Sequence, residues 1–160
     1  MKHVISVLVD NVPGVVSRIS GLFSGRGFNI ESFVGAPSLD SKISRIIIVT
    51  EGNEKIIEQI IKQLNKLIDV IKVTDLTGSE FVDREMILIS VKAEENNRAE
   101  VLRIVDIFRG KIVDVSPNCY TIEITGDQGK LQAILDLLKP LRIQEIVRSG
   151  RIALPRAKKR

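Results

Sequence analysis

The feature that most constrains the fold of this chain is an order of apolar patterns that occurs twice along it. In each half, a strand-like run precedes a helical stripe, two more strand-like runs, a second helical stripe and a last strand-like run. This βαββαβ order is that of a ferredoxin-like unit, and its recurrence indicates an internal repeat. We therefore predict an α+β fold of two tandem ferredoxin-like units, each an antiparallel sheet with its helices on one face.

The first half, residues 1–77, contains four predicted strands and two predicted helices. Apolar runs predict the strands at 4–9, 28–34, 43–49 and 70–76. The helices are predicted from two stripes with helical spacing, which consist of Val15, Val16, Ile19, Leu22 and Phe23, and of Ile56, Ile57, Ile60, Ile61 and Leu64.

The second half repeats this pattern after a predicted linker at 78–82, so the second domain is assigned residues 83–160. Its strands are predicted at 86–91, 112–115, 120–125 and 143–148. Its helical stripes consist of Val101, Ile104, Val105 and Phe108, and of Leu131, Ile134, Leu135 and Leu138. Each domain alone would have a thin core and an open sheet edge, so we expect pairing with another copy or with a partner chain.

Helix boundaries are predicted from capping residues. Asn53 and Asp127 precede helical stripes and should act as N-caps, as should Asn97 together with Glu100. The first helix should end at Gly25-Arg26-Gly27, and the third helix at Gly110.

Charge and hydropathy argue against nucleic-acid and membrane partners. The formal net charge is +4, and four of the positive charges belong to the predicted basic tail, 156–160, which leaves residues 1–155 neutral. A nucleic-acid-binding protein usually spreads basic residues over a folded face, often interleaved with aromatic residues. No apolar stretch approaches the roughly 18 residues that span a bilayer, and the run at 4–9 is too short for a signal peptide, so we expect a cytoplasmic protein.

The residues required for catalysis or metal binding are scarce. Cys119 is the only cysteine and His3 the only histidine, which excludes metal clusters built from these residues and leaves no credible base for a nucleophile. Lys111 and Lys130 follow glycines but lack the Ser or Thr that completes a P-loop. We therefore expect no catalytic residues and no metal site in this chain.

The segment Asp10-Asn11-Val12-Pro13-Gly14-Val15 is the one candidate binding site, because it crosses from a strand end into a helix start. Free amides and the dipole at that helix start can receive a carboxylate, and Gly14 lets a ligand approach the backbone. The Asn11 side-chain oxygen can accept a hydrogen bond from an ammonium group. These features suit an amino-acid zwitterion, although the same pattern also occurs as an ordinary strand-to-helix turn.

Longer motifs resemble the ACT domains of acetolactate synthase small subunits. In the first half these are the segments 10–15, 21–32, 44–45 and 67–70, and in the second half 84–86, 108–115 and 148–150. The resemblance covers nearly the whole chain, and the run Gly21-Leu22-Phe23-Ser24-Gly25-Arg26-Gly27-Phe28-Asn29-Ile30-Glu31-Ser32 is its most specific part.

The resemblance implies a site between two chains. Two ACT domains would pair as a homodimer and bind the feedback effector, usually valine, between them. In one chain the ligand would contact Asn11, Val12, Pro13, Gly14 and Val15. Asn29 and Ile30 of a second copy would close the site, and Ala36 would lie near its far wall.

The resemblance also implies a regulatory role in branched-chain amino acid biosynthesis. The chain would activate the large catalytic subunit of acetolactate synthase and confer feedback inhibition by valine. Thiamine diphosphate, magnesium and FAD are expected on that partner, and no cofactor on this chain. The second domain lacks residues that match Asn11 and Gly14, so it would dock and activate rather than sense.

Two alternative functions are less consistent with the sequence. An amino-acid-responsive transcriptional regulator, or another ACT-type sensor, would share the fold, but no helix-turn-helix segment remains once both repeats are assigned. A small ferredoxin-like enzyme would need a catalytic constellation that the sequence lacks.

Overall fold

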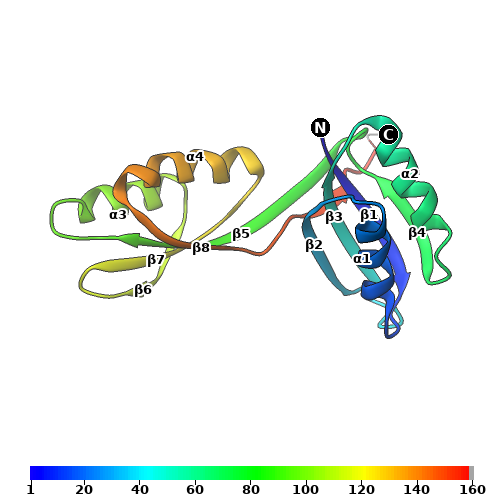
Figure 1. The fold of residues 1–160 in the computed structure, drawn as a ribbon. Helices are drawn as coiled ribbons and strands as arrows, with labels where there is room; N and C mark the ends of the chain where they lie inside the picture. Colours follow the sequence, from blue (N-terminus) through cyan, green and yellow to red (C-terminus); the bar gives the residue numbers. More distant parts are fainter. Residues whose placement is uncertain (159–160) are drawn as a thin grey trace. The chain divides into compact units, whose positions relative to one another are not determined.

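A computed structural model describes residues 1–158 and divides into two compact units (Figure 1). One unit contains residues 1–82 and 151–158, and the other contains residues 83–150. Each unit is an antiparallel sheet with two helices, which confirms the predicted α+β fold of two βαββαβ units. None of the helices in residues 1–158 is long and apolar enough to cross a membrane.

The first unit contains a four-stranded sheet in the order β2-β3-β1-β4, in which every neighbouring pair is antiparallel. The strands are β1 (Lys2–Asp10), β2 (Ile30–Pro37), β3 (Ile43–Glu51) and β4 (Val70–Asp75). The helices α1 (Val15–Gly25) and α2 (Glu54–Asn65) supply the stripes that the sequence predicts. They pack on one face of the sheet against apolar side chains of its central strands, Ile5, Val7, Val9, Ile46 and Ile48.

The second unit has the same architecture, with the strand order β6-β7-β5-β8. Its strands are β5 (Phe81–Lys92), the first two residues of which belong to the first unit, β6 (Lys111–Val115), β7 (Cys119–Gly126) and β8 (Ile143–Arg148). The helices α3 (Arg98–Ile107) and α4 (Gln128–Leu138), the latter followed by the 3₁₀ turn η1 (Lys139–Leu141), cover one face. The core is almost wholly aliphatic, as the low aromatic content requires.

Two of the three predicted N-caps are confirmed. The side chain of Asn53 accepts a hydrogen bond from the backbone N–H of Ile56, and that of Asp127 accepts one from Lys130. Asn97 does not cap α3: its Oδ1 accepts from the backbone N–H of Glu94, and its Nδ2 donates to the carbonyl of Lys92. Asn97 therefore stabilises the loop before the helix, because its side-chain amide binds two backbone groups of that loop and not the helix N-terminus.

The glycine turn after α1 is confirmed, and the one after α3 differs from the prediction. Gly27 has φ 69°, and the N–H of Phe28 donates to the carbonyl of Phe23, which ends α1 in the expected way. After α3 the left-handed residue is Arg109, with φ 54°, and not Gly110. At Gly110 the constraint is space, because a Cβ there would lie 3.2 Å from the carbonyl oxygen of Glu123, a tight contact.

The sequence pattern does not predict the ninth strand, β9 (Ile152–Pro155), which pairs with β5. Its Ala153 is buried in an apolar cluster of the first unit with Val4, Ile47, Val49 and Leu76. In the structure residues 151–158 therefore belong to the first unit, whereas the sequence pattern placed them in the second. Of the predicted basic tail, Lys159 and Arg160 lie outside the described residues.

Candidate functional site

The predicted ligand-binding segment forms the corner between the end of β1 and the start of α1. Gly14 is the residue before α1, and its backbone is left-handed, with φ 88°. A Cβ at this position would also lie 2.7 Å from Nη1 of Arg18. The left-handed backbone therefore favours glycine at this position, and a larger residue would also displace the end of the Arg18 side chain.

Hydrogen bonds hold this corner on both sides. The backbone N–H of Asn11 donates to the carbonyl of Lys42 at 2.8 Å, and its side-chain Nδ2 donates to the carbonyl of Ser41 at 2.9 Å. On the other side, Arg18 Nε donates to Asp69 Oδ2 at 2.7 Å, and Arg18 Nη2 donates to the carbonyl of Pro13 at 3.4 Å. Because its Nδ2 is committed to Ser41, Asn11 offers its Oδ1 as an acceptor.

A cavity of about 350 Å³ opens beside this corner on the helix-covered side of the sheet. Its walls are mainly aliphatic, and Asp10 is the only charged residue among the described residues that line it. The lining residues are Val9, Asp10, Asn11, Val12, Val15, Val16, Phe33, Gly35, Ala36, Pro37, Ser44 and Ile46. The start of α1 borders the cavity, so a carboxylate placed there would meet free backbone N–H groups and the positive end of the helix dipole.

The structure brings together only part of the predicted site. Asn11, Val12, Val15 and Ala36 line the cavity. Pro13 and Gly14 shape the corner through their backbone but do not line the cavity in this chain.

Asn29 and Ile30 lie at the start of β2, whereas Ala36 lies near its end. At ~3.4 Å per residue, these two ends of the strand are ~20 Å apart. Asn29 is exposed, and its carbonyl accepts a hydrogen bond of 2.6 Å from Thr50 Oγ1. Within one chain, Asn29 and Ile30 therefore do not reach the cavity.

Several lining residues were not predicted as site residues. Phe33 and Gly35 come from β2, Ile46 from β3 and Val9 from β1. Gly35 pairs with Ile46, and a Cβ on Gly35 would lie 3.3 Å from Ile46 Cγ1. The available signal was the period-2 alternation of these strands, which places Phe33 and Gly35 on one face, but it does not distinguish a cavity wall from ordinary core.

The described residues provide no metal centre. In residues 1–158, no three His, Cys, Asp or Glu side chains are arranged to hold a metal ion. His3 Nδ1 lies 2.9 Å from Asp75 Oδ2, and this pair belongs to the first sheet, not to the cavity. A hydrogen bond from Arg103 lowers the pKa of Glu100, but this pair lies on the exposed surface of α3.

Models of two protein families match the chain. The model described as "AHAS small subunit-like ACT domain" matches residues 5–72, which include the corner and the cavity. The model described as "Small subunit of acetolactate synthase" matches residues 84–157.

Curated relatives and a solved structure agree with the family models. The chain is 48% identical over 160 residues to the probable acetolactate synthase small subunit of Archaeoglobus fulgidus, with all of both chains covered. It is 46% identical to the acetolactate synthase isozyme 3 small subunit of Escherichia coli, covering 99% of this chain and 98% of that one. The crystal structure of the acetolactate synthase small subunit from Thermotoga maritima matches with a TM-score of 0.88 and 42% identity, covering 99% of both chains. The chain therefore belongs to the acetolactate synthase small subunits, the regulatory and not the catalytic chains of that enzyme.

Proposed function

We propose that the first unit senses valine and thereby controls the activity of the large catalytic subunit of acetolactate synthase. The observation that carries this proposal is the cavity at the start of α1, which combines an aliphatic wall with groups suited to both ends of a zwitterion. The amides at the start of α1 receive the carboxylate. Asn11 Oδ1 and Asp10 receive the ammonium group, and the aliphatic wall receives the branched side chain.

The sensing site is completed by a second copy of the chain. β2 is an edge strand of its sheet, and Val12 and Val16 beside the cavity are exposed. Open edges and exposed apolar residues favour pairing with another chain. If two β2 edges pair antiparallel about a two-fold axis, the start of one lies beside the end of the other. Asn29 and Ile30 of one chain then reach the cavity near Ala36 of the other.

Regulation follows from this arrangement by differential binding. Valine favours whichever conformation of the complex binds it more tightly, and it inhibits if that conformation holds the catalytic subunit in a less active state. The loop between β5 and α3 in the second unit corresponds to the corner between β1 and α1. It contains no glycine, since its sequence is Lys92-Ala93-Glu94-Glu95-Asn96-Asn97. We assign it docking and activation of the partner, which carries thiamine diphosphate, magnesium and FAD. We expect the complex to act in the cytoplasm.

The proposal is tested by measuring acetolactate formation by the reconstituted complex as valine is added. Gly14→Asp adds a side chain and a negative charge at the corner that borders the cavity, which disfavours binding of the ligand's carboxylate at the start of α1. Asn29→His alters the residue supplied by the second copy. Both variants should lose valine inhibition while still activating the catalytic subunit. Gly21→Ala on α1 and Asn65→His at the end of α2 are the matched controls, and both should keep normal inhibition.

The dimer has its own readout. Sedimentation of the isolated chain should show at least a dimer, and calorimetry should show valine binding that is absent in both site variants. Unchanged inhibition constants in Gly14→Asp and Asn29→His would rule out this placement of the site. A chain that is monomeric at all concentrations would rule out the shared site even if valine still binds.

A further inference from the structure

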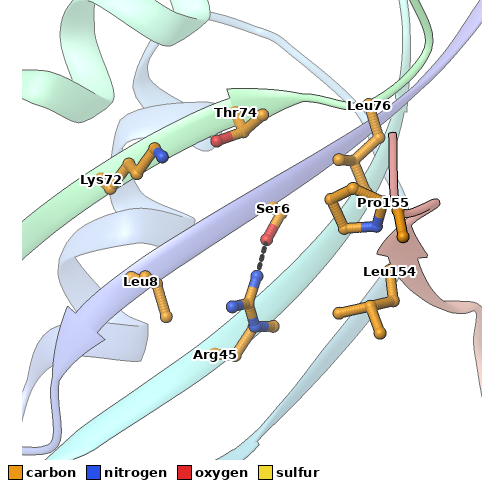
Figure 2. Close-up of a pocket in the computed structure, with 9 residues that line it drawn as sticks. Ser6, Leu8, Arg45, Lys72, Thr74, Leu76, Leu154 and Pro155 are labelled. Atoms are coloured by element: carbon orange, nitrogen blue, oxygen red, sulfur yellow. Dashed lines mark hydrogen bonds between the residues drawn. The ribbon is translucent and has the colours of Figure 1, made fainter. Parts of the chain in front are cut away.

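The face of the first sheet that lies opposite its helices carries a second cavity. Part of this face is covered by β9 and by Phe81, which pack on Val4, Ile47, Val49 and Leu76. Beside the covered part is a cavity of about 450 Å³, large enough for a small metabolite. Figure 2 shows Ser6 and Leu8 of β1, Arg45 of β3, Lys72 and Thr74 of β4, and Leu154 and Pro155 of β9 around it.

Strand register places one cationic residue on each side of β1, Arg45 on β3 and Lys72 on β4. Leu8 pairs with Arg45 on one side and with Lys72 on the other, so the three residues form one row across the sheet. Side chains that are paired in register point to the same face. Neighbouring strands are ~4.8 Å apart, so the two cationic residues start ~10 Å from each other and can approach one bound group above Leu8.

Arg45 is held in place by a neutral partner. Its Nη1 donates to Ser6 Oγ at 2.8 Å, and Ser6 is only 3% exposed. The Ser6 hydroxyl orients the guanidinium without neutralising its charge. The other N–H groups of the guanidinium remain available to donate hydrogen bonds to a ligand (Figure 2). Within residues 1–158 neither Arg45 nor Lys72 forms a salt bridge, and no acidic residue lines this cavity.

The chemistry of this cavity is complementary to that of the sensing cavity. The sensing cavity has Asp10 and the Asn11 oxygen for an ammonium group, whereas here the polar lining consists of two cations and the hydroxyls of Ser6 and Thr74. The remaining wall is aliphatic and includes Leu8, Leu76 and Leu154. A cavity with this lining repels an ammonium group and attracts an anion on a short aliphatic body.

We propose that Arg45 and Lys72 form a second ligand site, which binds a small carboxylate or phosphate that has a short aliphatic body and no ammonium group. The site is separate from the valine site, because it lies on the opposite face of the same sheet and shares no lining residue with it. The test of this second site therefore does not depend on whether the first cavity binds valine.

Calorimetry of the full chain with matched probes tests this site. The probes are 3-methyl-2-oxobutanoate, which has the skeleton of valine with a ketone in place of the amine, inorganic phosphate, and isobutylamine. The oxo acid should bind and isobutylamine should not. Arg45→Gln and Lys72→Gln should each weaken oxo acid binding about fivefold, the equivalent of ~1 kcal/mol for a partly exposed charge contact.

The controls separate this site from the sensing cavity and from misfolding. Lys55→Gln removes an exposed cation from α2, on the other face of the sheet, and Asn11→Ala alters the sensing cavity; both should leave binding unchanged. Lys72 is exposed, so its variant should melt like the parent protein even if Arg45→Gln does not. Amide NMR shifts should centre on Ser6, Lys72 and Thr74.

Each outcome decides the proposal. Binding of the oxo acid supports the proposal, whereas binding of inorganic phosphate alone overturns the proposed ligand class, because inorganic phosphate has no aliphatic body. The proposal is overturned if neither anion binds at millimolar concentrations, if Arg45→Gln and Lys72→Gln bind like the parent, or if Asn11→Ala abolishes binding.

Discussion

Replacement of Gly14 by alanine should destabilise the first unit, whereas the same replacement at Gly21, in the helix that follows, should stabilise it. Gly14 has φ 88°, a conformation that costs an L-residue about 1–2 kcal/mol. A Cβ there would also lie 2.7 Å from Arg18 Nη1. That atom is the end of a flexible side chain, so it can move away.

The cost of moving Arg18 can be estimated from the contacts it makes. Displacement weakens its hydrogen bonds to Pro13 and Asp69, and a half-exposed ion pair of this kind contributes about 0.5–1 kcal/mol. The expected destabilisation of Gly14→Ala is therefore about 1.5–3 kcal/mol, with backbone conformation as the larger part. Gly21 lies inside α1 with nothing within 4 Å of an added Cβ, so Gly21→Ala should stabilise by about 1 kcal/mol.

Urea unfolding at one fixed protein concentration is the measurement, because association changes the apparent stability. Gly14→Ala in an Arg18→Ala background separates the two contributions: most of the loss should persist, since the backbone conformation remains. A shift of the midpoint in the same direction for both glycine variants would contradict this prediction, as would a Gly14→Ala protein within about 0.5 kcal/mol of the parent.

Three further predictions concern packing, capping and charge. Ile60 is 0% exposed in the first core, so Ile60→Ala should cost about 2–5 kcal/mol in the free energy of unfolding, measured with urea. Asn53→Ala removes the N-cap of α2 and should cost about 1 kcal/mol by the same assay, whereas the exposed Lys55→Ala should cost less than half of that. The pKa of Glu100 is lowered by its hydrogen bond with Arg103, so this pair should stabilise α3 above the ordinary carboxyl pKa and lose that effect as the pH falls through the lowered value. An NMR titration should show the Glu100 pKa returning to its ordinary range in Arg103→Gln.

The repeated fold was predictable because each helical stripe and strand run carries a local signal. The stripes containing Ile60 and Leu131 pack as their spacing predicts. β9 was not predictable, because Ile152–Pro155 is short and its partner in β5 is remote in sequence. The Asn97 cap failed for a different reason: the residue type was right, but nearby backbone groups at Lys92 and Glu94 bind its amide instead.

The candidate site was predictable only where one segment carries it. The corner at Asn11 and Gly14 is predictable because a strand end, a Pro-Gly pair and a helix start are contiguous in the sequence. Phe33 and Gly35 reach the cavity through sheet register, which a single sequence does not state. Asn29 was assigned by resemblance alone, since its proposed role depends on another molecule.

The return of the chain to its first unit at Arg151 makes the second unit an insertion, with both of its ends joined to the same neighbour. A truncation after residue 150 therefore strips β9 from the amino-terminal half of the protein while sparing the half next to the cut. Deletion mapping along this chain would assign the resulting defect to the wrong unit. A deletion of residues 83–150 that joins Val82 to Arg151 removes the second unit and keeps all described segments of the first.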